Sequence, residues 1–455
     1  MSDRPKTLRD LGESLYKWVV DRLERTPFLS FKFTIPQQYL SPYGYLGTLT
    51  TVTFIVLGIS GAFLMFYYRP DVELAWLSVK EIEEEVPFGF IMRNLHYHAS
   101  NLMVLLAVAH LYYQYFSGRY KIKNEVLWVT GILLGILTVL EAYTGYDLIL
   151  NQRALLAINI GTGLTFAAPV IGPSVAPILI GGGLFDLIVR FYALHVFIIP
   201  MIMLVLMAFH IPRFLVLDIP IVLVLVGGIF VAGGMFPVHL GLRFDPSLPE
   251  ITVPEWYLTA IYAFIRTGTE RFFSGALLPL LFTIMFLIIP FVDKSRKLGW
   301  RDRPFFTALG ISSIILIIFT TLWGFYVDFS QPTPFEQLYI EPTIFYGSIT
   351  ALTLLGFFIT YRFITKPSPP RRPTPAKPFV LSSKGLLVAT TVVFALMVLT
   401  TLLAFQTYFA NMQNVSMFNM GMSLILFGLL LHLYRHGISR VAKQPSTTQQ
   451  PEVKA

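Results

Sequence analysis

Two apolar stretches of the chain each carry two histidines at nearly the same spacing. His96 and His110 are 14 residues apart. His195 and His210 are 15 apart, with Pro200 between them. In an α-helix, 14 residues make about four turns and rise about 21 Å, so two imidazoles share one face at two depths. We expect the proline to kink the second helix and absorb its extra residue. If the two helices lie side by side, their four histidines form two facing pairs.

Facing imidazoles can fill both axial positions of a haem iron. A single histidine in an apolar helix is usually a hydrogen-bonded packing residue, but ionisable groups inside a bilayer are rare and tend to be functional. Four histidines in two matched pairs therefore indicate two haems at two membrane depths. The chain has no cysteine, so it can form no disulfide, no thioether link to a haem and no iron–sulfur cluster through its own thiolates.

The composition predicts a membrane protein. Of 455 residues, 55% are hydrophobic and only 13% are charged, which excludes an ordinary soluble protein of several domains. The first 30 residues contain no apolar run of signal length, so we expect the first hydrophobic span to direct insertion. The net charge of +8 lies in loops beside apolar spans, where membrane topology explains it and nucleic-acid binding does not.

We predict an all-α, polytopic integral membrane protein: a di-haem four-helix bundle followed by C-terminal helices. About ten transmembrane helices are expected, over 46–67, 92–116, 126–148, 187–212, 218–236, 275–292, 305–326, 341–363, 384–407 and 414–434. The predicted parts are a cytoplasmic N-terminal segment (1–45), the di-haem domain (46–217), a second membrane domain (218–365), a proline-rich linker (366–383), two additional helices (384–434) and a polar tail (435–455). Residues 14–28 have one apolar face and predict a helix lying on the membrane surface.

The loop charges predict the orientation. The loops 117–125 and 293–304 are basic, as are both terminal segments, whereas 69–91 holds six acidic residues against two basic ones. By the positive-inside rule, we expect both termini to be cytoplasmic. The expected location is the plasma membrane of a cell. His96 and His195 then lie toward the outside, and His110 and His210 lie toward the cytoplasm.

Glycines repeat the spacing of the histidines. Gly47 and Gly61 are 14 apart in the first span, and Gly131 and Gly145 are 14 apart in the third. A flat macrocycle between helices needs positions without side chains, although glycines in membrane helices also serve as packing contacts. We interpret these four as haem-pocket residues.

A further motif, Pro254-Glu255-Trp256-Tyr257, lies between the fifth and sixth predicted spans on the outer side. A carboxylate between a proline and two aromatic side chains is suited to accept a proton from an apolar ring substrate. The alternative is an interfacial aromatic belt beside an incidental glutamate.

With these motifs, residues 10–363 resemble the cytochrome b subunit of quinol-oxidising bc and bf complexes, whose quinol site carries the sequence Pro-Glu-Trp-Tyr. Further matches are Arg-x-x-His at 93–96, Arg-Phe-Tyr-x-Leu-His at 190–195, the four glycines and Ala-Pro-Val-Ile-Gly at 168–172. The 15-residue histidine interval and Glu-x-x-Trp-Val-Thr-Gly at 125–131 are more similar to the bf type.

The chain also departs from the family pattern. It is continuous where the bf protein is split into two chains, and Tyr45 stands where that protein has the cysteine of an extra covalent haem. Residues 145–150 read Gly-Tyr-Asp-Leu-Ile-Leu where the family has Gly-Tyr-x-Leu-Pro-Trp, which alters the wall of the outer quinone pocket. The last two helices have no counterpart in the basic family pattern.

The resemblance implies two non-covalently bound haems. His96 and His195 would hold the outer one, and His110 and His210 the inner one. Arg93 and Arg190 would meet haem propionates, unless they are arginines reaching the membrane surface. These ligands suit haem B and a haem A-type relative alike, and haem B is the expectation.

The implied reaction begins with a quinol near Glu255. One electron passes to a Rieske iron–sulfur partner, the other crosses the two haems to a quinone on the cytoplasmic side, and protons leave on the outer side. Asp218 is a candidate for the inner quinone site, or else a helix cap. Glu141, inside the third span, would relay protons or pair with a basic group.

The implied partners are the Rieske protein, other respiratory subunits, the membrane quinone, the lipid bilayer and a second copy in a homodimer. Two rivals remain. A di-haem membrane anchor relaying electrons from another dehydrogenase to quinone would have no need of the motif at 254–257. A transporter using histidines for proton coupling would leave the matched glycines unexplained.

Overall fold

The computed structural model describes residues 8–23, 32–34, 42–121, 123–170, 172–212, 214–243, 245, 251–365 and 382–441. Helices dominate this part of the chain. The elements are α1 Leu8–Leu23, β1 Lys32–Thr34, η1 Pro42–Tyr45, α2 Leu46–Met65, α3 Ala75–Glu84, α4 Gly89–Phe116, α5 Glu125–Asp147, α6 Gln152–Ala167, α7 Gly172–Leu179, α8 Leu184–Ala193, η2 Leu194–Ile198, α9 Ile199–His210, β2 Phe214–Val216, α10 Ile219–Met235, α11 Thr259–Arg266, η3 Phe273–Leu277, α12 Leu278–Val292, η4 Trp300–Asp302, α13 Pro304–Phe325, α14 Pro334–Leu338, α15 Pro342–Ile364, α16 Ser383–Phe409 and α17 Gln413–Val441.

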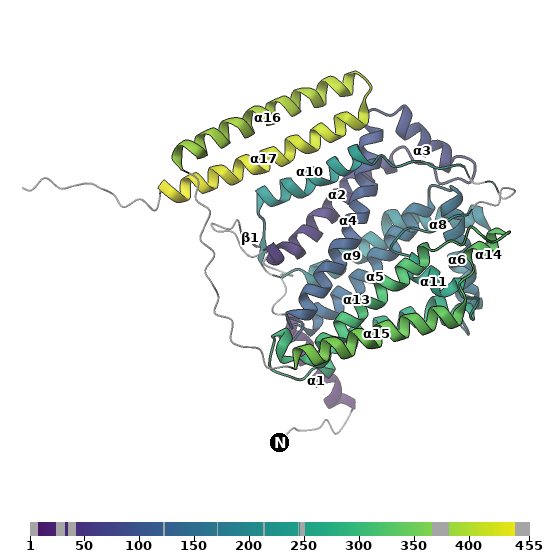
Figure 1. Ribbon diagram of the computed structural model, residues 1–455. Helices are drawn as coiled ribbons and strands as arrows, with labels where there is room; N and C mark the ends of the chain where they lie inside the picture. The colour runs from purple at the N-terminus through teal and green to yellow at the C-terminus, as the bar shows by residue number, and fades with distance from the viewer. Residues whose placement is uncertain are drawn as a thin grey trace, which may run out of the picture.

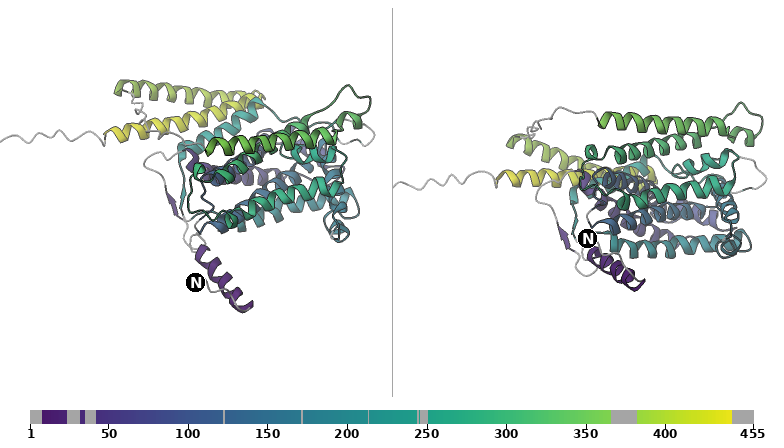
Figure 2. Two further views of the ribbon diagram at one scale, coloured as in Figure 1. Left: turned by 60° about the horizontal axis from the view of Figure 1, so that its bottom comes forward. Right: turned by 90° about the horizontal axis from the view of Figure 1, so that it is seen from below.

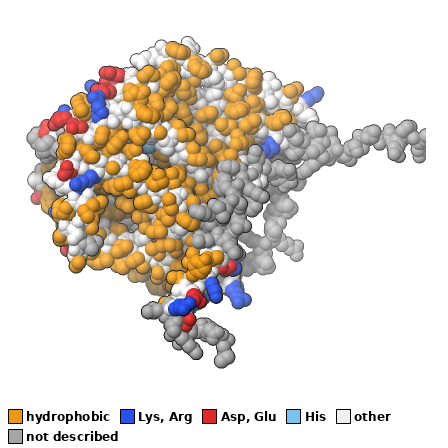
Figure 3. Space-filling view, turned by 180° about the vertical axis from the view of Figure 1, so that it is seen from behind, with side chains coloured by type: hydrophobic (Ala, Val, Ile, Leu, Met, Phe, Trp, Pro, Cys, Tyr) orange, Lys and Arg blue, Asp and Glu red, His pale blue; other side chains and the backbone are white. Residues whose placement is uncertain are grey.

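Each of the ten predicted spans coincides with a helix or with a continuous run of helical elements. Eight candidates in the described part of the chain are long and apolar enough to cross a membrane. The other two predicted spans are α10, which has only 17 residues, and α4, whose first half carries the polar run from Arg93 to His98. Apolar side chains cover most of the face seen in Figure 3, with charged ones gathered toward its edges. The all-α membrane class is confirmed.

The four predicted bundle helices lie together. Helix α2 packs on α4, and α5 packs on α9, so the helices with matched glycines each contact a helix with histidines. A second group contains α11, α13 and α15, while α16 and α17 form an antiparallel hairpin whose α17 lies along α10 (Figure 1).

A π-helical turn absorbs the extra residue between His195 and His210. The turn covers Leu194–Ile198 and ends just before Pro200, so His195 lies within it. A π-turn adds one residue to a helix without ending it and is frequent at functional sites. The sequence analysis predicted a distortion in this segment and assigned it to a proline kink. The structure shows that a widened π-helical turn beside the proline realigns the two histidines.

The N-terminal segment differs from its prediction. Its helix α1 begins at Leu8, earlier than the expected 14–28, and residues 24–31 lie outside the described part. It stands apart from the main body in Figure 2, yet Arg22 pairs with Glu125 at 2.9 Å. Strands β1 and β2 form a short parallel pair, which the all-α prediction did not include.

At the other end of the chain, α17 continues to Val441, beyond its predicted end at 434. The predicted linker, 366–383, lies outside the described residues except for its last two positions. Most of the predicted tail, 442–455, also lies outside them.

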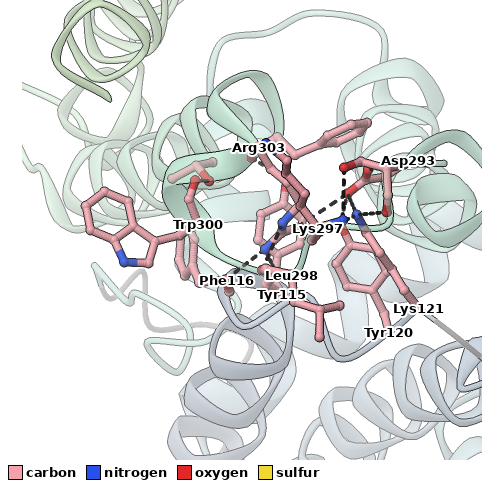
Figure 4. A network of polar contacts seen from close by, with 12 residues as sticks. Tyr115, Phe116, Tyr120, Lys121, Asp293, Lys297, Leu298, Trp300 and Arg303 are labelled. Atoms are coloured by element: carbon pink, nitrogen blue, oxygen red, sulfur yellow. Dashed lines mark hydrogen bonds and ion pairs between the residues drawn. The ribbon is translucent and has the colours of Figure 1, made fainter. Parts of the chain in front are cut away.

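A buried polar network joins the loop after α4 to the segment between α12 and α13 (Figure 4). Asp293 Oδ2 lies 2.7 Å from Lys121 Nζ and 3.4 Å from Arg303 Nη1, and it accepts a 2.6 Å hydrogen bond from Tyr120. The side chains of Asp293 and Arg303 are each 1% exposed. Arg303 also donates to the carbonyls of Tyr115 and Phe116, which end α4. One carboxylate thus compensates two buried cations.

We predict that Asp293→Asn strongly destabilises the protein, because it leaves Lys121 and Arg303 buried without a compensating charge. Removing one charge from a buried ion pair typically lowers the free energy of unfolding by about 3–5 kcal/mol. The thermal denaturation midpoint of the purified protein in detergent measures the loss. The matched control is Asp302→Asn, whose partner Lys297 lies 3.7 Å away on the surface and contributes little. Equal midpoints for the two variants would contradict this account.

Candidate functional site

The four histidines form two facing pairs. The ring centroids of His96 and His195 are 6.2 Å apart with an interplanar angle of 81°, and those of His110 and His210 are 6.2 Å apart at 86°. A metal about 2 Å from each coordinating nitrogen, which is itself about 1.1 Å from its ring centre, needs about 6.2 Å between centroids. Each pair therefore leaves room for one metal ion ligated on both sides.

Hydrogen bonds orient three of the four rings through Nδ1. The acceptors are Ser60 Oγ for His96 at 2.9 Å, the Glu141 carbonyl for His195 at 3.0 Å and the Leu127 carbonyl for His210 at 2.8 Å. Ser60 donates its own proton to the Val56 carbonyl, so its oxygen can accept. An Nδ1 that donates leaves the Nε2 lone pair for a metal. His110 Nδ1 is buried and has no hydrogen-bond partner among the described residues.

The matched glycines lie directly against these rings. A Cβ at Gly61 would lie 3.1 Å from His96, one at Gly47 would lie 3.3 Å from His110, and one at Gly131 would lie 2.8 Å from His210. A Cβ at Gly145 would overlap the His195 ring. These glycines thus admit the imidazoles themselves, whereas the sequence interpretation assigned them to the space for a macrocycle.

A cavity of about 410 Å³ surrounds the first pair. His96, His195, Gly61 and Gly145 contribute to its wall, as does Pro200. The lining is largely apolar, as expected for a cofactor or ring substrate. The cavity continues to the tyrosines 97, 146 and 257.

Arg93 lines this cavity, and Arg190 does not. Arg93 Nη1 pairs with Glu83 at 2.7 Å, while its buried Nη2 has no hydrogen-bond partner among the described residues. A propionate would satisfy that nitrogen. Arg190 instead donates to the carbonyls of Pro177 and Ile178 near the end of α7. Its predicted propionate role stays a prediction that the geometry does not support.

The motif at 254–257 lies beside the same cavity. Glu255 is only 7% exposed, and its Oε1 accepts a 2.7 Å hydrogen bond from Arg153. Tyr97, which lines the cavity, donates to Glu255 Oε2 at 3.4 Å. The carboxylate therefore has a cation on one oxygen and a cavity-lining hydroxyl on the other.

The two aromatic residues of the motif have separate contacts. Trp256 Nε1 donates to Asn101 on α4 at 2.6 Å, and Tyr257 donates to the Ala142 carbonyl on α5 at 3.4 Å. Burial, together with the Glu255 charge, raises the pKa of Tyr257 well above its usual value. Tyr257 therefore stays protonated. Pro254 is buried beside it.

Sequence reasoning missed Arg153. Asn151 caps α6 by accepting from the Ala154 amide at 2.9 Å and donates to the Leu240 carbonyl, which places Arg153 in the first helical turn. Its distance of 102 residues from Glu255 along the chain hid the contact. The only local signal was an arginine just after the altered segment 145–150.

Asp218 and Glu141 also have defined surroundings. Asp218 occupies the N-cap position of α10 without capping it; its Oδ2 instead accepts hydrogen bonds from Tyr45 and Arg435. The cap interpretation is therefore wrong. Glu141 has the carboxylate oxygen Oε1 3.2 Å from His195 Nδ1, so its basic neighbour is a histidine of the first pair.

A family model described as "Cytochrome b/b6/petB" matches residues 32–217, and one described as "Cytochrome b(C-terminal)/b6/petD" matches residues 246–340. The cytochrome b6 proteins of Porphyra purpurea and Synechococcus sp. (strain JA-3-3Ab) are each 36% identical over 201 residues, 43% of this chain and 93% of each relative. The chain belongs to the cytochrome b family. It is thus a multi-pass cytochrome b of a bc- or b6f-type complex, as the sequence motifs indicated.

A solved structure titled "Hyperthermophilic respiratory Complex III" supports the fold. It shares 22% identity with a TM-score of 0.55, over 78% of this chain and 100% of that one. Neither family match reaches α16 or α17. Cytochrome b proteins bind haem, and the 6.2 Å gaps, the Nδ1 anchors and the unpaired nitrogen of Arg93 all fit that group.

We predict that Gly131→Val removes one of two haems, because the added side chain collides with His210. Gly135→Val is the matched control on the same helix, since a Cβ there meets nothing within 4 Å. The haem-to-protein ratio from a pyridine extract should fall from about two toward one only in the first variant. An unchanged ratio in Gly131→Val would refute the assignment of the second pair.

Proposed function

We propose that this cytochrome b is the quinol-oxidising subunit of a bc-type respiratory complex, working with a Rieske iron–sulfur partner. The buried Glu255, bridged by Tyr97 to the cavity of the first histidine pair, carries the proposal. A di-haem anchor that only relays electrons has no use for a buried carboxylate held in this way. That arrangement suits a substrate that loses protons as it loses electrons.

The residues around Glu255 have separate roles in removing a proton from the substrate. Arg153 donates to Oε1, while Oε2 faces Tyr97 and the cavity, where a quinol hydroxyl can donate its proton. The side chain of Arg153 is 47% exposed, so the proton taken by Glu255 has a short way to water. Tyr257 lines the cavity, and Trp256 packs against it with ring centroids 5.8 Å apart, so these two rings limit the access of water to the substrate. Pro254 is buried beside Glu255.

His96 with His195, and His110 with His210, would hold two haems, each ligated by both imidazoles. When bound, these haems supply one-electron transfer between two membrane depths. Moving a unit charge against about 100 mV stores about 2.3 kcal/mol, so separating the pairs along α4 contributes to a proton gradient. The ligands suit haem B, and a haem A-type macrocycle would use the same atoms.

We infer that the end with the acidic segment 69–91 faces outward and that the basic loops 117–125 and 293–304 face the cytoplasm of a cell bounded by this plasma membrane. Asp218 then belongs to an inner quinone site near the His110–His210 pair. The expected assembly also contains the Rieske protein, other complex subunits and a second copy of this chain in a homodimer.

We predict that Glu255→Gln slows quinol oxidation about 100-fold or more, because the amide cannot accept the proton. The reduced-minus-oxidised spectrum of both haems should be unchanged. The measurement is the steady-state rate of quinol-dependent acceptor reduction by the assembled complex. Glu84→Gln, at an exposed carboxylate on α3, is the control. Normal turnover in Glu255→Gln would overturn the proposed site.

We predict a smaller effect for Arg153→Gln, about tenfold on the same rate, since one charged hydrogen bond to Glu255 is lost. Arg153→Lys keeps the charge and should stay within about threefold of the wild-type rate. If the glutamine and lysine variants behave alike, the charge of Arg153 is not what orients Glu255.

A further inference from the structure

Arg435, near the end of α17, reaches the residue assigned to the inner quinone site. Its Nη1 lies 3.0 Å from Asp218 Oδ2, although the two are 217 residues apart in the chain. Tyr45, at the end of η1 and just before α2, donates to the same oxygen at 3.2 Å. Three segments from different parts of the chain thus meet on one carboxylate.

Only one of the two Asp218 carboxylate oxygens has a hydrogen-bond partner in the part of the chain that the structure describes. Its side chain is 1% exposed, and Oδ1 is buried with no hydrogen-bond partner among the described residues. An unsatisfied buried carboxylate oxygen is costly unless a ligand or water completes it. Oδ1 is therefore the atom that can accept a hydrogen bond from a ring hydroxyl of a quinol, while Oδ2 anchors the group.

Close helix contact fixes the position of α17. Gly227 on α10 and Gly421 on α17 approach so closely that a Cβ on either would lie 2.6 Å from the carbonyl oxygen of the other. A Cβ at Gly428 would lie 2.8 Å from the Pro220 carbonyl, just after Asp218. Backbone contact of this kind sets the register of membrane helices. Arg435 is consequently held at a defined height beside the start of α10.

We propose that the hairpin of α16 and α17 forms part of the inner quinone site and that Arg435 positions Asp218. This inference rests on the proposed function, because it takes Asp218 to be the quinone-facing group. Arg435 acts through Asp218: its guanidinium balances the carboxylate and turns Oδ1 toward the ligand. Its side chain is 21% exposed, so it is only partly buried, unlike Asp218.

The test uses the complete complex with both haems and follows reoxidation of the inner haem by an added short-chain naphthoquinone or benzoquinone after a reducing pulse. Arg435→Gln should slow this step about tenfold, the loss of one charged hydrogen bond, and Arg435→Lys should restore it to within about threefold. Gly421→Val, which displaces the hairpin without changing charge, should resemble Arg435→Gln. Tyr434→Phe, at an exposed neighbouring position, is the matched control.

A double variant separates positioning from a general loss of structure. If Arg435 acts through Asp218, then Asp218→Asn with Arg435→Gln is no slower than Asp218→Asn alone. The inference would be overturned if the double variant were slower than Asp218→Asn by the full factor that Arg435→Gln causes alone. A normal rate in Arg435→Gln would overturn it as well. In both cases the proposed function would stand. A wild-type complex whose inner haem is never reoxidised by either quinone would overturn the proposed function and this inference with it.

Discussion

Each histidine pair keeps its ring centroids 6.2 Å apart, and the neighbouring helices are built around these two gaps. A smaller gap would leave no room for a ligated metal, and a larger one would lose one of its two bonds. The glycines of α2 and α5 lie against the rings because any side chain there would push them toward the gap. Carbonyls and a serine hydroxyl then fix the ring orientation through Nδ1.

The carboxylates proposed for the two quinone sites depend on cations from distant segments. Glu255 is held by Arg153 of α6, and Asp218 by Arg435 of α17. A buried carboxylate without such a partner is strongly disfavoured. In both cases one oxygen is occupied by the arginine, and the other faces Tyr97 or has no partner in the described structure. In our proposal, the appended hairpin of α16 and α17 is therefore part of the inner quinone site.

Periodic features were predictable from the sequence, and contacts between distant segments were not. The 14-residue spacing of His96 and His110 predicted their shared face, because helix geometry is local. The π-turn at His195 was missed because hydrophobic spacing does not distinguish it from a proline kink. The partners of Glu255 and Asp218 were missed because they lie 102 and 217 residues away. No local rule assigns such pairs.

The most direct test of the account is the number and type of haems in the purified wild-type protein. A dithionite-reduced minus oxidised spectrum, combined with a pyridine extract, gives both quantities. We expect two low-spin haems per chain, each with two imidazole ligands. A properly assembled preparation without haem would contradict the interpretation of the histidine pairs as haem ligands and would favour a proton-coupled transporter.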